Sequence, residues 1–299
     1  MASSPAERRI ERAAAAVVDR LGRLRTRSRR AVHGSPGGRR RSAERGRSVE
    51  FREHRPYTRG DDLRSVDWRA WARTDRLYVR QQDAEADLRV TLLVDASGSM
   101  AYGEHSQNKH EYAAVAAVAL ATLWLRQLDA VGSVRWDAEP ASVAPARGLA
   151  QATRLVQTLA PAPTRGKIDF DASCRRYAET HGEGGVAVVL SDLLHPTPAI
   201  EAGLATLNAT GVRVAVLQLM HDDEVDFPLS GATRFVSLES GDTLDANPRS
   251  LRRRYLSELA KHQASVAAAC DKAGVLRLFT RTSEPVDPTL AELLARLGR

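Results

Sequence analysis

Apolar and polar positions group along most of the chain into blocks that predict strands separated by helices. Continuous apolar runs predict buried strands over residues 90–95, 132–137, 186–191, 212–219 and 275–280. A shorter run predicts a further strand over 234–238. Helices are predicted between and after them, over residues 109–129, 149–160, 170–180, 198–209, 248–273 and 288–297. Apolar strands that alternate with helices imply a parallel sheet covered on both faces. We therefore expect a doubly wound, mostly parallel α/β domain.

The first 87 residues follow a different pattern. Apolar residues at a spacing of three to four predict a helix over 6–31, whereas residues 33–48 are Gly, Ser and Arg and predict a flexible basic linker. Residues 49–87 are dense in Arg, Asp and aromatics, which predicts short strands and turns with one strand over 77–81. Three regions result: a basic helical or disordered arm (1–47), a small β-rich subdomain (48–87) and the α/β domain (88–299).

The positive charge belongs to the arm. The 299 residues carry a net charge of +7, but residues 1–47 hold fourteen Arg and four acids, a net of +10, which leaves −3 for the rest. Such an arm, over residues 8–47, is suited to nucleic acid or an anionic surface. A solubilising disordered tail explains the same composition, and the arm has no aromatic residue for base stacking.

Membrane and disulfide features are weak in this sequence. The longest apolar run covers 113–125, shorter than the roughly 20 residues that a membrane span needs. The two cysteines, Cys174 and Cys270, are far apart and lack metal-binding spacing, so no disulfide framework is predicted. We expect a cytoplasmic protein without a transmembrane segment.

One motif carries candidate chemistry. The first apolar strand ends in Asp95, and Ser97 and Ser99 follow in an Asp-x-Ser-x-Ser pattern around Gly98. Asp192 follows a second apolar strand and joins the cluster if the two strands are neighbours. An all-oxygen set of this kind suits a hard divalent cation, Mg²⁺ first and Mn²⁺ or Ca²⁺ next. The alternative is a polar turn with Ser99 capping the next helix.

Two other polar segments each leave two interpretations open. The acidic run 221–226 follows a strand and predicts a solvated loop or a second cation site. The segment 60–68 predicts a docking surface or an Arg–Asp network that holds the small subdomain together.

The Asp-x-Ser-x-Ser motif resembles the metal-ion-dependent adhesion site of von Willebrand factor A domains. That resemblance implies that Asp95, Ser97, Ser99 and Asp192 hold the metal together with a Thr, here Thr164, and that a partner's acidic group completes the shell. The expected Gly-Thr-Asp-like turn is altered in residues 164–169, where a strict alignment places Lys167 or Ile168 at the Thr position. A lysine there would replace the metal with its own ammonium.

A wider resemblance covers residues 39–299. Blocks that recur in order with fixed spacing resemble the "domain of unknown function 58" family, namely residues 49–57, 60–64, 66–68, 72–74, 77–79, 95–100, 189–196 and 233–242. The resemblance implies an intracellular, non-enzymatic protein with a von Willebrand A-like domain, often encoded beside a MoxR-type AAA+ ATPase.

These observations favour an adaptor that binds a protein partner through a divalent cation, with the MoxR-type ATPase as the partner that the resemblance implies, in complex or metal-centre assembly. An Mg²⁺-dependent hydrolase or phosphotransferase would use the same cluster. Against an enzyme, the sequence shows no nucleophile motif or phosphate-binding loop beside Asp95. A third hypothesis is binding to nucleic acid or an anionic surface through residues 8–47.

Overall fold

A computed structural model describes residues 3–23, 51–57, 68, 71, 76–82, 88–104, 108–163, 166–180 and 184–298. The chain divides into two compact units, one formed by Met1–Ser35 with Leu88–Arg299 and the other by Pro36–Asp87. Among the described residues, no helix has the length and apolar character needed to cross a membrane.

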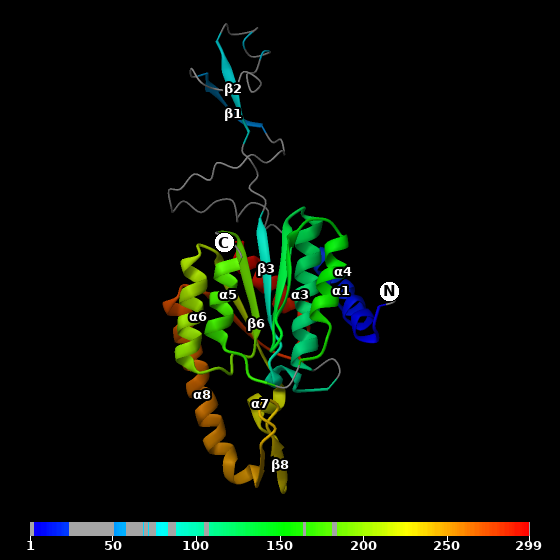
Figure 1. Ribbon diagram of the computed structural model, residues 1–299, viewed down its shortest axis with the longest axis vertical. Helices are drawn as coiled ribbons and strands as arrows, with labels where there is room; N and C mark the ends of the chain where they lie inside the picture. The colour runs from blue at the N-terminus through cyan, green and yellow to red at the C-terminus, as the bar shows by residue number, and fades with distance from the viewer. Residues whose placement is uncertain are drawn as a thin grey trace. The chain divides into compact units, whose positions relative to one another are not determined.

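The larger unit is built on a six-stranded sheet with the order β10-β7-β6-β3-β4-β5. Its strands are β3 (Arg89–Asp95), β4 (Ala130–Trp136), β5 (Ala141–Ala146), β6 (Val186–Ser191), β7 (Arg213–Met220) and β10 (Leu276–Arg281). Neighbouring strands are parallel except at the edge, where β5 runs antiparallel to β4. The predicted doubly wound, mostly parallel α/β fold is confirmed (Figure 1).

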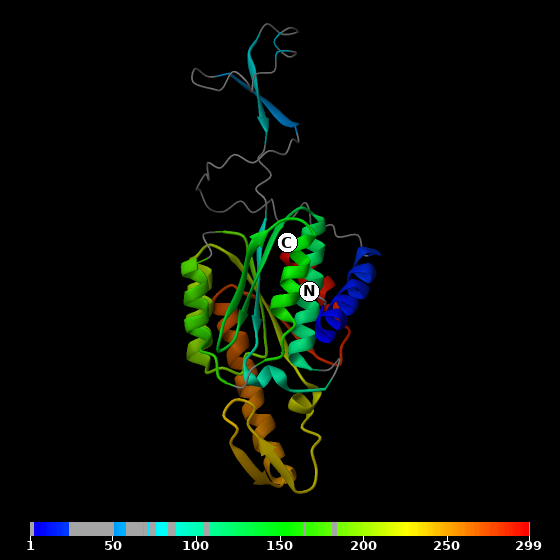
Figure 2. The same cartoon turned by 45° about the vertical axis from the view of Figure 1, so that its right-hand side comes forward.

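Helices cover both faces of this sheet, because its central strands are apolar on both sides. One buried cluster joins the sheet to α1 (Pro5–Arg23), α3 (Lys109–Arg126), α4 (Ala150–Leu159) and α9 (Val286–Leu297). The other joins it to α5 (Phe170–Thr180), α6 (Thr197–Ala209) and α8 (Pro248–Lys272). Figures 1 and 2 show these two helical layers, with α1 outside α3. Cys174 and Cys270 are free thiols within the second cluster, and burial raises the pKa of the Cys270 thiol to about 11.

The N-terminal helix belongs to the larger unit and not to a separate arm. Its apolar stripe is buried in the cluster with α3 and α9, through residues Ile10, Ala14, Val17, Val18 and Leu21. Two arginines of α1 pair with that unit, Arg9 with Glu111 at 2.5 Å and Arg20 with Asp287 at 2.9 Å. The predicted helix over 6–31 therefore exists as Pro5–Arg23, and residues 24–50 lie outside the described part.

Short elements account for the differences from the predicted pattern. The apolar pattern of the sequence did not indicate three of these elements. They are the strand β5, the five-residue helix α7 (Asp222–Asp226), and the strand β9 (Thr243–Ala246), which forms a hairpin with β8 (Thr233–Val236). β5 includes a proline and is only half-buried, and β9 is exposed along most of its length, so neither shows an apolar run.

The smaller unit contains an antiparallel pair, β1 (Phe51–Pro56) and β2 (Tyr78–Gln82). β2 matches the strand predicted over 77–81. Within the same unit the rings of Trp68 and Trp71 meet edge to face at 6.1 Å, and both side chains are exposed.

Candidate functional site

The candidate site lies at the carboxyl edge of the sheet, where the strand order changes direction. β3 and β6 are adjacent, with Val94 opposite Leu190, so Asp95 and Asp192 both stand at the ends of neighbouring strands. The adjacency that the metal hypothesis required is therefore present. Open α/β sheets bind ligands at this position, because the chain leaves neighbouring strands in opposite directions there.

Asp95 is fully buried and accepts three hydrogen bonds. Its Oδ1 accepts from the Ser97 backbone N–H at 2.8 Å, and its Oδ2 accepts from Ser191 Oγ at 2.5 Å. His195 Nε2 lies 3.2 Å from the same Oδ2. Burial lowers the pKa of His195, but the hydrogen bond and charge of Asp95 outweigh it, so the pKa is raised. The carboxylate of Asp95 is thus fixed by a backbone N–H, a hydroxyl and an imidazole.

The two motif serines follow Asp95 and bring their hydroxyls together, and the Ser99 side chain also hydrogen-bonds Asp192. Ser97 Oγ and Ser99 Oγ are 3.1 Å apart, and Ser97 is buried while Ser99 is half-buried. Ser99 caps no long helix, because α3 is capped by Asn108, whose side chain accepts from the Glu111 backbone N–H. Two convergent hydroxyl oxygens next to a carboxylate are a donor set that hard cations accept.

The loop after β6 holds a strained backbone. Leu193 has a φ of 53° although it is neither glycine nor exposed. Its backbone N–H donates to Ser191 Oγ at 2.9 Å, and the N–H of Leu194 donates to Asp192 Oδ1 at 3.0 Å. A β-carbon in this region costs about 1–2 kcal/mol, so the surrounding contacts must impose the turn that aims Asp192.

Lys109 is the residue of the site that the sequence analysis missed. Its side chain is fully buried, and its Nζ lies 2.8 Å from Asp192 Oδ2 and 2.6 Å from Glu224 Oε1. Burial lowers the pKa of Lys109, but the two carboxylates outweigh it and the pKa is raised. Burial likewise raises the pKa of Asp192, and the charge of Lys109 outweighs it, so the pKa is lowered. Both partners are therefore charged, and the pair is a buried ion pair.

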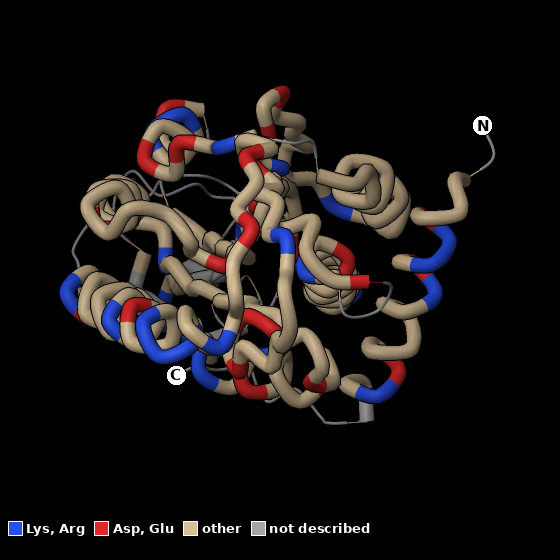
Figure 3. Tube along the Cα trace, turned by 90° about the horizontal axis from the view of Figure 1, so that it is seen from below, with Lys and Arg blue, Asp and Glu red and all other residues tan. Residues whose placement is uncertain are grey.

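The acidic run 221–226 is a short helix with mostly half-buried residues and not a solvated loop. It forms α7, whose first turn is closed by a capping box between His221 and Glu224. Its acids pair with the protein's own cations: Glu224 with Lys109, and Asp222 and Asp226 with Arg281 at 3.2 and 2.6 Å. No cluster of three or more His, Cys, Asp or Glu side chains suited to a metal occurs among the described residues. Figure 3 shows acidic and basic positions interleaved at this end of the unit.

A second loop covers the motif. A β-carbon on Gly98 would lie 2.3 Å from the carbonyl oxygen of Leu238, so the backbone after β8 is packed directly on the motif. The N–H of Gly98 also donates to the carbonyl of Gly166 at 3.0 Å. Figures 1 and 2 show α7 and the β8–β9 hairpin beyond the end of the sheet where this motif lies. Only glycine allows this approach.

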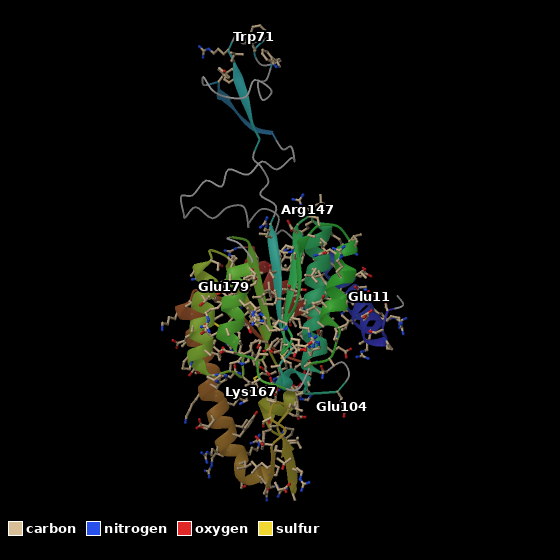
Figure 4. The ribbon with its side chains drawn as sticks, in the orientation of Figure 1. Glu11, Trp71, Glu104, Arg147, Lys167 and Glu179 are labelled. Carbon is tan, nitrogen blue, oxygen red and sulfur yellow. The ribbon has the colours of Figure 1, made fainter. Side chains whose placement is uncertain are left out.

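The sequence offers three candidates for the Thr position of the adhesion-type site, namely Thr164, Lys167 and Ile168. Thr164 lies outside the described residues. Lys167 does not take the role of the ammonium, since its side chain is 75% exposed and its Nζ lies 3.7 Å from Glu239 (Figure 4). The ammonium inside the site comes from α3, at Lys109.

The described residues therefore fit a divalent cation in part. Asp95, Ser97 and Ser99 form an oxygen set with no protein cation other than the His195 ring against it. Asp192 differs, because it accepts from the Lys109 ammonium and from a backbone N–H, in addition to the Ser99 side chain.

Comparison with known families places the chain. The model of the family described as "Protein of unknown function DUF58" matches residues 53–265, within the span over which the sequence resemblance extends. The chain belongs to the DUF58 family. An uncharacterized protein of Mycobacterium tuberculosis (strain H37Rv) is 29% identical to this DUF58 chain over 239 residues, which cover 77% of this chain and 74% of the relative.

Solved structures with a similar fold include two that the DUF58 chain matches at low identity. BatB of Bacteroides thetaiotaomicron has a TM-score of 0.47 and 11% identity, over 70% of this chain and 98% of that one. The SpRpn10 VWA domain has a TM-score of 0.40 and 11% identity, over 69% and 95%.

Proposed function

We propose that this DUF58 protein is a non-enzymatic adaptor that binds a protein partner at the carboxyl edge of its sheet, with a divalent cation held by Asp95, Ser97 and Ser99. The observation that supports the proposal most directly is the geometry of the motif, in which the Ser97 backbone N–H donates to the Asp95 carboxylate at 2.8 Å. Asp95 is fully buried, the two hydroxyls are 3.1 Å apart, and Ser99 is half-buried.

The chain's own residues prepare this set of oxygens. Ser191 and His195 hold the Asp95 carboxylate in place, and the close approach of Leu238 to Gly98 fixes the turn that carries the two serines. A bound Mg²⁺ would supply an open coordination position for a carboxylate of the partner. Recognition would then require both the cation and an acidic residue of the partner.

The partner class that the family resemblance implies is a MoxR-type AAA+ ATPase. We propose it as the first partner to test, with complex or metal-centre assembly as the process. Its acidic docking residue would meet the Asp95 set, since protein oxygens from three side chains leave a hard cation's shell of six ligands incomplete.

The test is a binding assay between the full chain and the MoxR-type ATPase encoded in the same genome. We expect binding in Mg²⁺ that weakens by at least about tenfold, or 1.4 kcal/mol, in EDTA and in Asp95→Asn. Glu201→Gln is the matched control, because Glu201 is an exposed acid on α6 that pairs with Lys272. Binding that survives both EDTA and Asp95→Asn would contradict the cation-dependent mechanism.

The enzyme alternative uses the same residues and needs a separate assay. Ser191 and His195 are buried and engaged with Asp95, so neither is presented as a nucleophile or general base. Generic phosphoesters hydrolysed by the full chain, and not by Asp95→Asn, would favour the hydrolase.

The third hypothesis is that residues 8–47 bind nucleic acid or an anionic surface. Fewer of their arginines are available for this than the composition implied. Arg9 and Arg20, two of the arginines of α1, pair with acids of the larger unit. Salt-sensitive binding to DNA or anionic vesicles, compared between the full chain and a variant with residues 39–41 changed to Ser, tests it.

A further inference from the structure

Lys109 links three segments that leave the carboxyl edge of the sheet. It is the first residue of α3, which follows β3, whereas Asp192 follows β6 and Glu224 lies in α7 after β7. The Nζ atom is within 2.8 Å of a carboxylate oxygen of each acid, and the side chains of Lys109 and Asp192 are fully buried. Glu224 is 16% exposed.

Both oxygens of Asp192 are already engaged. Oδ2 accepts from Lys109, and Oδ1 accepts from the backbone N–H of Leu194 at 3.0 Å. A metal ion at bonding distance from Oδ2 would meet the ammonium in a site from which water is excluded, where repulsion between like charges is strong. Removing the ammonium would leave two carboxylates without a countercharge, and a divalent cation is the natural replacement.

We propose that Lys109 is a resident cation that takes the place of a metal ion at Asp192, so that any divalent cation in this protein is bound without Asp192. The statement about the divalent cation rests on the proposed function, whereas the role of Lys109 at Asp192 and Glu224 does not. The adhesion-type motif is in this way divided into one position for an exchangeable cation and one filled by the chain itself.

The first experiment measures binding of Mn²⁺ by calorimetry to the wild-type chain, Asp192→Asn and Asp95→Asn. We expect Asp192→Asn to change the affinity by less than about threefold, and Asp95→Asn to weaken it by more than about tenfold. A loss of more than about tenfold in Asp192→Asn would overturn the inference and leave the proposed function standing. If the wild-type chain binds no Mn²⁺, the cation of the proposed function fails and the second experiment decides on Lys109.

The second experiment follows thermal unfolding of Lys109→Met with and without Mn²⁺. We expect a lowered Tm that millimolar Mn²⁺ raises again, because the ion replaces the ammonium between Asp192 and Glu224. The matched control is Lys109→Met with Asp192→Asn and Glu224→Gln, in which Mn²⁺ has no carboxylates to bind at this position and the Tm shift should fall to that of the wild-type chain.

The outcomes separate clearly. A Lys109→Met chain that Mn²⁺ does not stabilise, or that stays unfolded in Mn²⁺, overturns the inference. A Tm shift of equal size in the triple variant also overturns it, since the ion would then act elsewhere. A shift in Lys109→Met that is larger than the shifts of the triple variant and of the wild-type chain supports it.

Discussion

Two carboxylates, Asp95 and Asp192, stand at the ends of adjacent strands and are equally buried, yet the protein treats them differently. Asp95 is held by a hydroxyl, a backbone amide and a histidine, whereas Asp192 is held by a lysine that also pairs with Glu224. The difference shows that two carboxylates at equivalent positions in the fold can be held by partners of different charge. The proposed cation at Asp95 and the proposed role of Lys109 at Asp192 both start from this difference.

The largest expected effect comes from removing the countercharge at Asp192. Lys109→Met should lower the free energy of unfolding by about 3–5 kcal/mol, because it leaves buried carboxylates unpaired. Lys272→Met is the matched control: Lys272 pairs with Glu201 at 3.0 Å with its side chain 76% exposed, and its loss should cost less than about 1 kcal/mol. Urea unfolding of both variants measures the difference, and similar costs would show that the buried pair contributes no more than the exposed one.

A smaller effect is expected at the Asp95 end, where packing and not charge holds the loop. Gly98→Ala should destabilise the protein by about 1–3 kcal/mol, since the new methyl meets the Leu238 backbone. Gly22→Ala is the control, because nothing lies within 4 Å of its β-carbon position in α1, and alanine should stabilise the helix by up to about 1 kcal/mol. Equal effects in thermal unfolding would mean that Leu238 moves away freely.

The smallest expected effect on stability comes from His110, which follows Lys109 at the start of α3. Both are buried, but His110 has no carboxylate partner among the described residues, and its Nε2 donates to the Leu159 carbonyl oxygen at 3.0 Å. Burial, then the charge of Arg135, lowers the pKa of His110. The unfolded chain therefore binds more protons as the pH falls below about 6.5, and the stability contributed by neutral His110 is lost.

The measurement is the free energy of unfolding of the wild-type chain and His110→Gln at pH 7.5 and 5.5. We expect the advantage of the wild-type chain to shrink at the lower pH. The comparison must be made between the two chains, because His195 has a raised pKa and shifts stability with the opposite sign. An advantage that grows on acidification would mean that His110 is charged in the fold.

Much of this organisation follows from local sequence. The long apolar runs predicted the parallel strands, and the Asp-x-Ser-x-Ser spacing predicted that Asp95, Ser97 and Ser99 meet at a strand end. β5 and β9 were missed because they are short and partly exposed, so burial leaves no periodic signal in them.

The role of Lys109 could not be predicted for a different reason. Its partners lie 83 and 115 residues away along the chain, and nothing local marks a lysine as buried. One signal was available afterwards: Lys109 begins the helix that contains the apolar stretch 113–125, a place where a charge needs a partner. The interpretation of 221–226 failed for the same reason, since its cationic partners come from α3 and β10.

The docking of α1 has a consequence for synthesis of the chain. Its apolar face packs against α3 and also against α9, the last helix, and Arg20 pairs with Asp287. At the usual rate of about 5–20 residues per second, α9 leaves the ribosome roughly 15–50 seconds after α1. Throughout that interval the first helix has an apolar stripe with no finished surface to cover it. Helix α1 is thus made well before one of the surfaces that covers it, and a chaperone that shields amphipathic helices has an opportunity to bind there during that interval.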